Sequence, residues 1–177
     1  MTNWMGKGRT AVVTGAAGGI GLATARRLAE TGMNIVIADV KQDDLAEAEI
    51  SLASTGAEIL SLVCDVSDFG QVQQLKGAVT ERFGKVHCLM NNAGIGRMGT
   101  KPWEDLDAFN QMLNVNLMGV VHGCHAFIPA MLEHGEPGVV INTCSKQGIT
   151  RPPGNYAYNL SKAGVLAYTE SLALAFR

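Results

Sequence analysis

The chain has 177 residues, of which 47% are hydrophobic and 17% are charged, and its 14 basic and 16 acidic side chains give a net charge of −2. This composition excludes a disordered, collagen-like or coiled-coil chain. It also lacks the basic excess that is typical of proteins that bind nucleic acid or an anionic membrane. The length fits one domain with a buried core.

The cysteines and histidines do not indicate a metal site. Four cysteines are widely spaced, without metal-ligand or redox-motif spacing: Cys64, Cys88, Cys124 and Cys144. We expect reduced, mostly buried thiols and a cytoplasmic location. His122 and His125 could meet on one helix face, but no further ligand stands near them, so we expect packing or surface roles. The N-terminal segment lacks the apolar core of a signal peptide, and no uninterrupted apolar run is long enough to cross a membrane.

Short apolar runs alternate with longer helical patterns along the chain. We predict strands over residues 10–14, 34–38, 58–64, 86–90 and 139–142. We predict helices over residues 20–31, 43–54 and 68–83, helical segments from about 103 to 134, and a last helix from about 156 to the end of the chain. Ser67 is the expected N-cap of the third helix, and Gly84 ends that helix.

Three predicted strands are continuously apolar instead of alternating: Ala11–Val13, Ile35–Ile37 and Val139–Ile141. Such strands are typical of a parallel sheet that is covered by helices on both faces. Together with the alternation of strands and helices, they predict a doubly wound α/β sheet. Ligands of such a sheet bind beyond the carboxyl ends of its strands.

A glycine-rich turn, TGAAGGIG, joins the first strand to the first helix over residues 14–21. Residues without a Cβ allow the chain to turn sharply, let a pyrophosphate approach the backbone, and let the helix pack on the strand. The N-terminus of the helix then faces the phosphates. A tight turn without any ligand would use the same glycines.

Asp39 ends the second strand, 18 residues after Gly21. A carboxylate at this position can accept hydrogen bonds from a ribose diol and repels a 2′-phosphate, so it favours NAD over NADP. Lys41 would partly relieve that repulsion. An ordinary strand-end turn is the other interpretation of this aspartate.

Tyr158 and Lys162 are four residues apart and therefore share one face of the last predicted helix. A phenol has a pKa of about 10, and a neighbouring ammonium stabilises the phenolate. The pair could therefore give a proton to a carbonyl or take one from an alcohol. Tyr156 would face away from Lys162. Taken alone, a tyrosine and a lysine at this spacing are common by chance.

Polar residues also follow the fourth and fifth strands. Ser145, 13 residues before Tyr158, could hydrogen-bond a substrate oxygen, and no histidine or acid is placed to make it a nucleophile. Asn91–Gly94 could tie neighbouring strands together and leave room for a cofactor, although a simple turn would use the same residues. Asn116 opens an apolar helix, either as a cap or as a buried amide that holds a water leading to Lys162.

Taken together, these motifs resemble the short-chain dehydrogenase/reductase family over essentially the whole chain. The resemblance implies a single dinucleotide-binding domain over residues 1–177 with a Rossmann-type sheet, and hydride transfer between NAD(P) and a small carbonyl or alcohol substrate. It implies these catalytic residues: Asn116, Ser145, Tyr158 and Lys162. It implies these cofactor-binding residues: Gly15, Gly18, Gly19, Ile20, Gly21, Asp39, Asp65, Val66, Asn92, Ala93, Gly94, Tyr158 and Lys162.

The family usually continues past the last helix, so we expect the domain to be short on its C-terminal side and to lack the family's last strands. Apolar surface would then be exposed at that edge. The resemblance also implies a homodimer or homotetramer formed through Leu117–His134 and Tyr156–Arg177. Specificity is expected from the loops Ile95–Lys101 and Lys146–Asn155. The alternatives are a truncated, catalytically incompetent NAD-binding or assembly module and, less favoured, a methyltransferase on a similar sheet.

Overall fold

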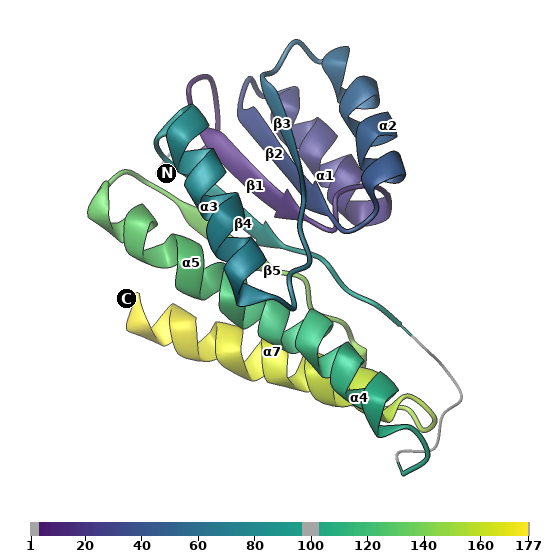
Figure 1. Ribbon diagram of the computed structural model, residues 1–177. Helices are drawn as coiled ribbons and strands as arrows, with labels where there is room; N and C mark the ends of the chain where they lie inside the picture. Colours follow the sequence, from purple (N-terminus) through teal and green to yellow (C-terminus); the bar gives the residue numbers. More distant parts are fainter. Residues whose placement is uncertain (1–3, 97–102, 177) are drawn as a thin grey trace.

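The computed structural model describes residues 4–96 and 103–176 (Figure 1). Five parallel strands form one sheet in the order β3-β2-β1-β4-β5. Their bounds are β1 Thr10–Thr14, β2 Asn34–Asp39, β3 Ile59–Val63, β4 Cys88–Asn91 and β5 Val139–Asn142. The predicted strands are all present, with ends that differ by up to two residues.

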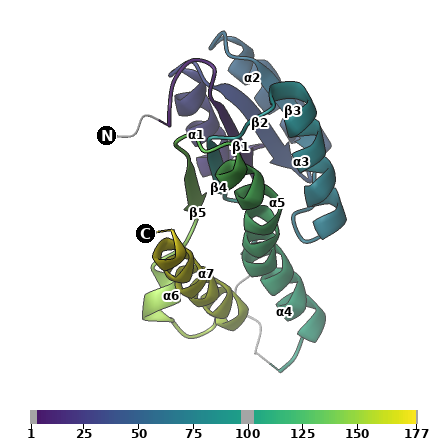
Figure 2. The same cartoon turned by 90° about the vertical axis from the view of Figure 1, so that its left-hand side faces the viewer.

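The helices lie in two layers against this sheet. Their bounds are α1 Gly19–Ala29, α2 Gln42–Ala53, α3 Phe69–Phe83, α4 Leu106–Leu113, η1 Asn114–Met118, α5 Gly119–Glu133, α6 Gln147–Thr150 and α7 Tyr156–Ala175. Helices α1 and α2 cover one face, and α3, α5 and α7 lie on the other (Figures 1 and 2). The doubly wound parallel sheet predicted from the sequence is therefore confirmed.

Strand β1 lies at the centre of the sheet, and all five of its residues are buried. Val12 pairs in register with Val36 of β2 and Leu89 of β4, and these three side chains face α3 and α5. Val13 points to the opposite face, toward α1 and α2. Because β2 and β4 lie on either side of β1, the chain leaves β1 at the point where a doubly wound sheet reverses direction, which is where such sheets bind ligands.

Two helix starts differ from the sequence-based expectation. Asp68, and not Ser67, caps α3, because its Oδ1 accepts hydrogen bonds from the backbone N–H groups of Gly70 at 2.8 Å and Gln71 at 3.3 Å. The Ser67 hydroxyl instead donates to Asp65 Oδ1 at 2.7 Å. The second difference is at α4, which begins at Leu106 after the N-cap Asp105. Aspartate and serine are equally good caps, so the sequence could not choose between Ser67 and Asp68.

The helical run Leu106–Glu133 is 28 residues long and apolar enough to cross a membrane by length and composition. That criterion is weak, since the core helix of a soluble protein also meets it. Within this fold, Phe127 and Met131 of the run are buried against the sheet beside α3.

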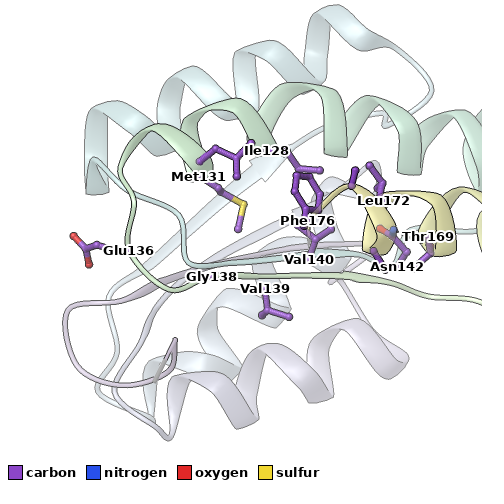
Figure 3. A pocket seen from close by; sticks show the side chains of 13 residues that line it. Ile128, Met131, Glu136, Gly138, Val139, Val140, Asn142, Thr169, Leu172 and Phe176 are labelled. Carbon is purple, nitrogen blue, oxygen red and sulfur yellow. Dashed lines mark hydrogen bonds between the residues drawn. The ribbon is translucent and has the colours of Figure 1, made fainter. Parts of the chain in front are cut away.

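Strand β5 pairs only with β4 in the part of the chain that the structure describes. Its outer edge, together with α5 and the C-terminal part of α7, borders a mainly apolar groove of about 520 Å³ (Figure 3). Met131 extends from α5 into this groove, and Leu172 and Phe176 come from α7. The expected apolar surface at this edge of the sheet is therefore present.

A buried histidine, His87, lies at the opposite end of the sheet, where the strands begin. His87 Nδ1 accepts a hydrogen bond from the backbone N–H of Thr10 at 3.1 Å, and its Nε2 lies 3.3 Å from the Glu136 carboxylate. The ring must therefore be neutral, with its proton on Nε2. Burial lowers the pKa of His87, and the hydrogen bond with Glu136 opposes this only in part.

This geometry predicts acid sensitivity. The neutral His87 ring is favoured in the folded state and protonated more readily in the unfolded chain, so folding stability is full at neutral pH. Stability should fall as the pH is lowered through about 6.5, the ordinary pKa of histidine, because a second ring proton would face the Thr10 N–H. Urea unfolding at a series of pH values should show a shallower pH dependence for His87→Gln. The exposed His125→Gln variant should behave as the native chain does, and equal pH dependence in all three proteins would contradict the assignment.

Candidate active site

Two adjoining pockets lie at the carboxyl ends of β1 and β4. The first, here called the Asp39 pocket, has a volume of about 420 Å³ and is lined by the glycine turn and by the residues that follow β2 and β3. The second, the Tyr158 pocket, has a volume of about 510 Å³ and is lined by residues of the β5–α7 region. Asn92, Gly94 and Ile95 line both pockets, so the two pockets adjoin at these residues.

The glycine turn presses against the end of β4. Gly15 has a φ of +64°, and a Cβ at this residue would lie 2.6 Å from Ala93 Cα. At Gly21 a Cβ would lie 2.3 Å from the Gly15 carbonyl oxygen. At Gly18, by contrast, a Cβ would meet no atom within 4 Å. Gly15 and Gly21 are therefore required for packing, whereas Gly18 leaves the backbone open toward the Asp39 pocket.

Asp39 is held in place by two backbone N–H groups. Its Oδ2 accepts a hydrogen bond from Ala17 at 3.1 Å, and its Oδ1 accepts one from Lys41 at 3.2 Å. The ammonium of Lys41 forms an exposed ion pair with Asp44 at 3.1 Å. The Asp39 carboxylate thus lies on the wall of its pocket without a cation bound to it among the described residues.

Asp65 and Val66, which follow β3, line the same pocket. Asp65 Oδ1 accepts hydrogen bonds from the Ser67 N–H at 2.9 Å and from the Ser67 hydroxyl at 2.7 Å. Val66 is buried, and Gly119 of α5 packs so closely on it that a Cβ there would lie 2.6 Å from Val66 Cγ2. This packing fixes the wall of the pocket that faces α5.

Thr14 and Asn92 tie the ends of β1 and β4 together. The Thr14 hydroxyl oxygen accepts hydrogen bonds from the N–H groups of Asn92 at 3.0 Å and Ala93 at 3.1 Å. In return, Asn92 Nδ2 donates to the carbonyl oxygens of Thr14 at 3.0 Å and Gly15 at 3.1 Å. Asn91 makes the equivalent link to β5, with Nδ2 donating to Asn142 Oδ1 at 2.9 Å. The strand-tying role predicted for these amides is what the structure shows.

Asn116 differs from its predicted position. It lies in the π-helical turn η1, inside a continuous helical run, and so it does not open a helix. A π turn carries one extra residue, a feature that often occurs at functional sites. Asn116 is fully buried, accepts a hydrogen bond from the Ile95 N–H at 2.7 Å, and donates one to the Ile95 carbonyl at 2.8 Å. It therefore fixes the backbone of a residue that lines both pockets.

Tyr158 and Lys162 lie on one face of α7 and line the same pocket. The Lys162 ammonium is 5.7 Å from the centre of the Tyr158 ring and donates a hydrogen bond to the Thr143 carbonyl at 2.7 Å. Burial lowers the pKa of Lys162. Tyr156, which was expected to face away from Lys162, is exposed and does not line either pocket. Ser145 is half-buried just beyond β5, and its hydroxyl oxygen accepts a hydrogen bond from the Gln147 N–H at 3.2 Å.

Most of the predicted site residues meet at this edge of the sheet. The two pockets are lined by these predicted residues: Gly15, Gly18, Ile20, Asp39, Asp65, Val66, Asn92, Ala93, Gly94, Tyr158 and Lys162. Gly19, Gly21, Asn116 and Ser145 do not line either pocket. The predicted specificity loop Ile95–Lys101 lies outside the described residues from position 97 onward.

Thr143, which accepts the Lys162 hydrogen bond, was not predicted, and its only signal in the sequence is its place after the fifth strand. Gln147 and Asn155 line the Tyr158 pocket, and both belong to the predicted specificity loop Lys146–Asn155, although neither was singled out there. The four cysteines are free, and the described residues contain no cluster of three or more metal-ligating side chains.

A glycine turn after the first strand and a carboxylate after the second, at one edge of a doubly wound sheet, are typical of the dinucleotide-binding class of fold, and the tyrosine–lysine pair lies at the same edge. The chain matches the short chain dehydrogenase family over residues 9–177 and belongs to that family. Among its curated relatives is 1-deoxy-11-beta-hydroxypentalenate dehydrogenase from Streptomyces avermitilis, which is 38% identical over 165 residues, or 92% of this chain and 61% of the relative.

Solved structures give the same result. A short chain dehydrogenase/reductase from Burkholderia phymatum in complex with NAD is 42% identical, with a TM-score of 0.92 over 97% of this chain and 60% of that protein. A metagenomic short-chain oxidoreductase in complex with NADP is 32% identical, with a TM-score of 0.91 over 97% of this chain and 77% of that protein. The chain thus spans about three-fifths of the length of the first of these structures and of the curated relative above.

The Thr14 hydroxyl provides a direct test of the site's framework. Thr14→Val keeps the side-chain shape but leaves the Asn92 and Ala93 N–H groups without their acceptor. A buried unsatisfied donor costs about 1–3 kcal/mol, so the free energy of unfolding should fall by at least about 1 kcal/mol in urea titrations. The matched variant Thr80→Val, on the exposed face of α3, should change it by less than about 0.5 kcal/mol. Equal effects of the two variants would show that the Thr14 bonds add no stability.

Proposed function

We propose that this chain transfers a hydride between NAD(H) and a small substrate with a carbonyl or secondary alcohol group. The observation that carries the proposal is the position of Lys162, whose ammonium lies 5.7 Å from the Tyr158 ring in a pocket that adjoins the Asp39 pocket. Membership of the short chain dehydrogenase family supports it.

The residues of the Asp39 pocket fit a dinucleotide. The open backbone at Gly18 and the N-terminus of α1 suit a pyrophosphate. Asp39 would accept hydrogen bonds from the adenosine ribose, Asp65 and Val66 would contact the adenine, and Asn92–Gly94 would line the path toward Tyr158. When bound, the nicotinamide supplies or accepts the hydride.

The protein's own groups would move the proton and hold the substrate. Tyr158 acts as the acid in carbonyl reduction and as the base in alcohol oxidation. The Lys162 ammonium lies 5.7 Å from the centre of the Tyr158 ring and would bind the nicotinamide ribose. Ser145 orients the substrate oxygen through its hydroxyl hydrogen, since the oxygen already accepts the Gln147 N–H. Asn116 is assigned to the proton relay, and its bonds to Ile95 keep it in place.

NAD is the cofactor we propose, because the Asp39 carboxylate would face a 2′-phosphate and Lys41 is paired with Asp44 instead. We also propose that the chain associates with itself through α5 and α7, since Leu132, Leu160 and Leu174 on these helices are more than half exposed. The free thiols support a reducing, cytoplasmic location. A catalytically incompetent binding module would not require the tyrosine–lysine geometry.

Replacing Tyr158 tests the enzymatic role. Tyr158→Phe removes the proton donor and keeps the ring, so the rate of NADH oxidation or formation should fall by about 10²- to 10⁴-fold. NAD affinity, measured by calorimetry, should remain near that of the native chain. Tyr156→Phe, two residues away on the exposed face, is the matched control. Substantial activity in Tyr158→Phe would exclude this role, and no NADH formation from any secondary alcohol by the native chain would favour the binding module.

Replacing Asp39 tests the cofactor preference. Asp39→Ala removes both the ribose acceptor and the negative charge, so the ratio of NADP to NAD dissociation constants should fall by about tenfold or more, given about 1.5–3 kcal/mol for a charged hydrogen bond. Asp43→Ala on the exposed face of α2 should leave this ratio unchanged. A native chain that already binds NADP more tightly than NAD would overturn the preference.

A further inference from the structure

Two amide side chains, Gln147 and Asn155, line the Tyr158 pocket beside the tyrosine–lysine pair. Asn155 Nδ2 donates a hydrogen bond to Gln147 Oε1 at 2.9 Å, whereas Asn155 Oδ1 is buried and has no partner. Exchanging oxygen and nitrogen in both amides keeps their mutual bond and still leaves one polar atom of Asn155 unpaired. Buried amide atoms nearly always have a partner, so this pair has unused hydrogen-bonding capacity.

The position of Gln147 is fixed by close packing. Helix α6 presses on α7 so tightly that a Cβ at Gly148 would lie 2.8 Å from the carbonyl carbon of Lys162. Gln147, the residue before Gly148, also donates its backbone N–H to the Ser145 hydroxyl oxygen at 3.2 Å. The Gln147 backbone is therefore fixed relative to both Ser145 and Lys162.

Hydrogen bonds on both sides of Asn155 in the sequence also fix its backbone. Its carbonyl accepts the backbone N–H of Asn159 at 2.8 Å in the first turn of α7. The side chain of Asn159 in turn donates to the Pro152 carbonyl at 2.7 Å, which ties down the segment leading to Asn155. The two amides are thus preorganised, and ordering them on binding carries little further entropic cost.

The chemistry of the pocket selects for a neutral polar group. Among the described residues that line it, Lys162 is the only one with a formal charge, and one of its three N–H donors is bound to the Thr143 carbonyl. In the proposed function its ammonium binds the nicotinamide ribose, so the described lining offers no second cation to a carboxylate or phosphate on the substrate. An amide pair with spare donor and acceptor capacity matches a hydroxyl, which both donates and accepts.

We propose that Gln147 and Asn155 bind a second hydroxyl group of the substrate, which makes the substrate class a diol or polyol, or the corresponding hydroxyketone. The second hydroxyl takes no part in the reaction. This inference rests on the proposed function, because it takes the reacting oxygen to lie at Tyr158 and Ser145. A substrate with a single oxygen would leave the Asn155 amide atom unpaired, as it is without substrate, and would gain no hydrogen bond from the amide pair.

Butane-2,3-diol and butan-2-ol test this proposal, because they differ by one hydroxyl group. Dissociation constants from the NAD-saturated chain can be measured by saturation-transfer NMR, and NADH formation can be followed in parallel. The diol should bind about tenfold more tightly, the effect of one additional well-placed hydrogen bond at the upper end of its usual range. Gln147→Leu and Asn155→Ser should each bring the ratio of the two dissociation constants to about one. Gln74→Leu, an amide removed from the exposed face of α3, should keep the native ratio.

The possible results separate this inference from the proposed function. Equal dissociation constants for the two alcohols in the native chain, or no detectable binding of the diol, overturn the role of the amide pair whether or not NADH forms. A diol preference that disappears in Gln147→Leu and Asn155→Ser supports it, even in a chain that does not turn over. Failure to form NADH from either alcohol, with the diol preference intact, counts against the oxidoreductase function alone. The two variants alter different elements, so one that does not fold leaves the other as the test.

Discussion

The hydrogen bonds between Thr14 and Asn92 hold the two strand ends on which the site depends. They bring the carboxyl ends of β1 and β4 together at the point where the sheet changes direction. The glycine turn lies directly on this junction, because a Cβ at Gly15 would collide with Ala93. Both pockets are lined by Asn92, Gly94 and Ile95. A change at this junction would therefore alter the cofactor side and the substrate side at once.

The buried side chain of Asn116 fixes the wall that the two pockets share at Ile95. Ile95 has no regular secondary structure, yet its N–H and carbonyl are both bound by the buried amide of Asn116. A loop backbone that borders a pocket would otherwise be free to move, since loops have few internal hydrogen bonds. Asn116 is also 3.4 Å from the Ser161 hydroxyl, which lies one residue before Lys162. The helix that carries Tyr158 and Lys162 is thereby connected to the wall between the pockets.

The sequence predicted the sheet and most of the site because these depend on short-range patterns. Continuous apolar strands such as Val12 and Val36 indicated burial on both faces, and the spacing of Tyr158 and Lys162 indicated one helix face. Asn116 was misplaced because a π turn has no distinct sequence pattern and interrupts the helix only in its hydrogen bonding. Gln147 and Asn155 lie in the predicted specificity loop Lys146–Asn155, but the hydrogen bond between them was not predicted, because it depends on the close approach of α6 to α7. Ser67 was predicted as the N-cap of α3 in place of Asp68, because serine and aspartate both cap helices well.

The π turn also has a consequence for the phase of the long helix that contains it. A regular helix advances by about 100° per residue. One additional residue in η1 therefore rotates α5, which follows it, relative to α4, which precedes it. Met112 of α4 and Phe127 of α5 are both buried, on opposite sides of η1. Deleting one residue within η1 would restore regular helical geometry and keep the length of the helix almost unchanged. It would also turn the buried side of one half by about a quarter of a turn, so the two halves could no longer both face the core.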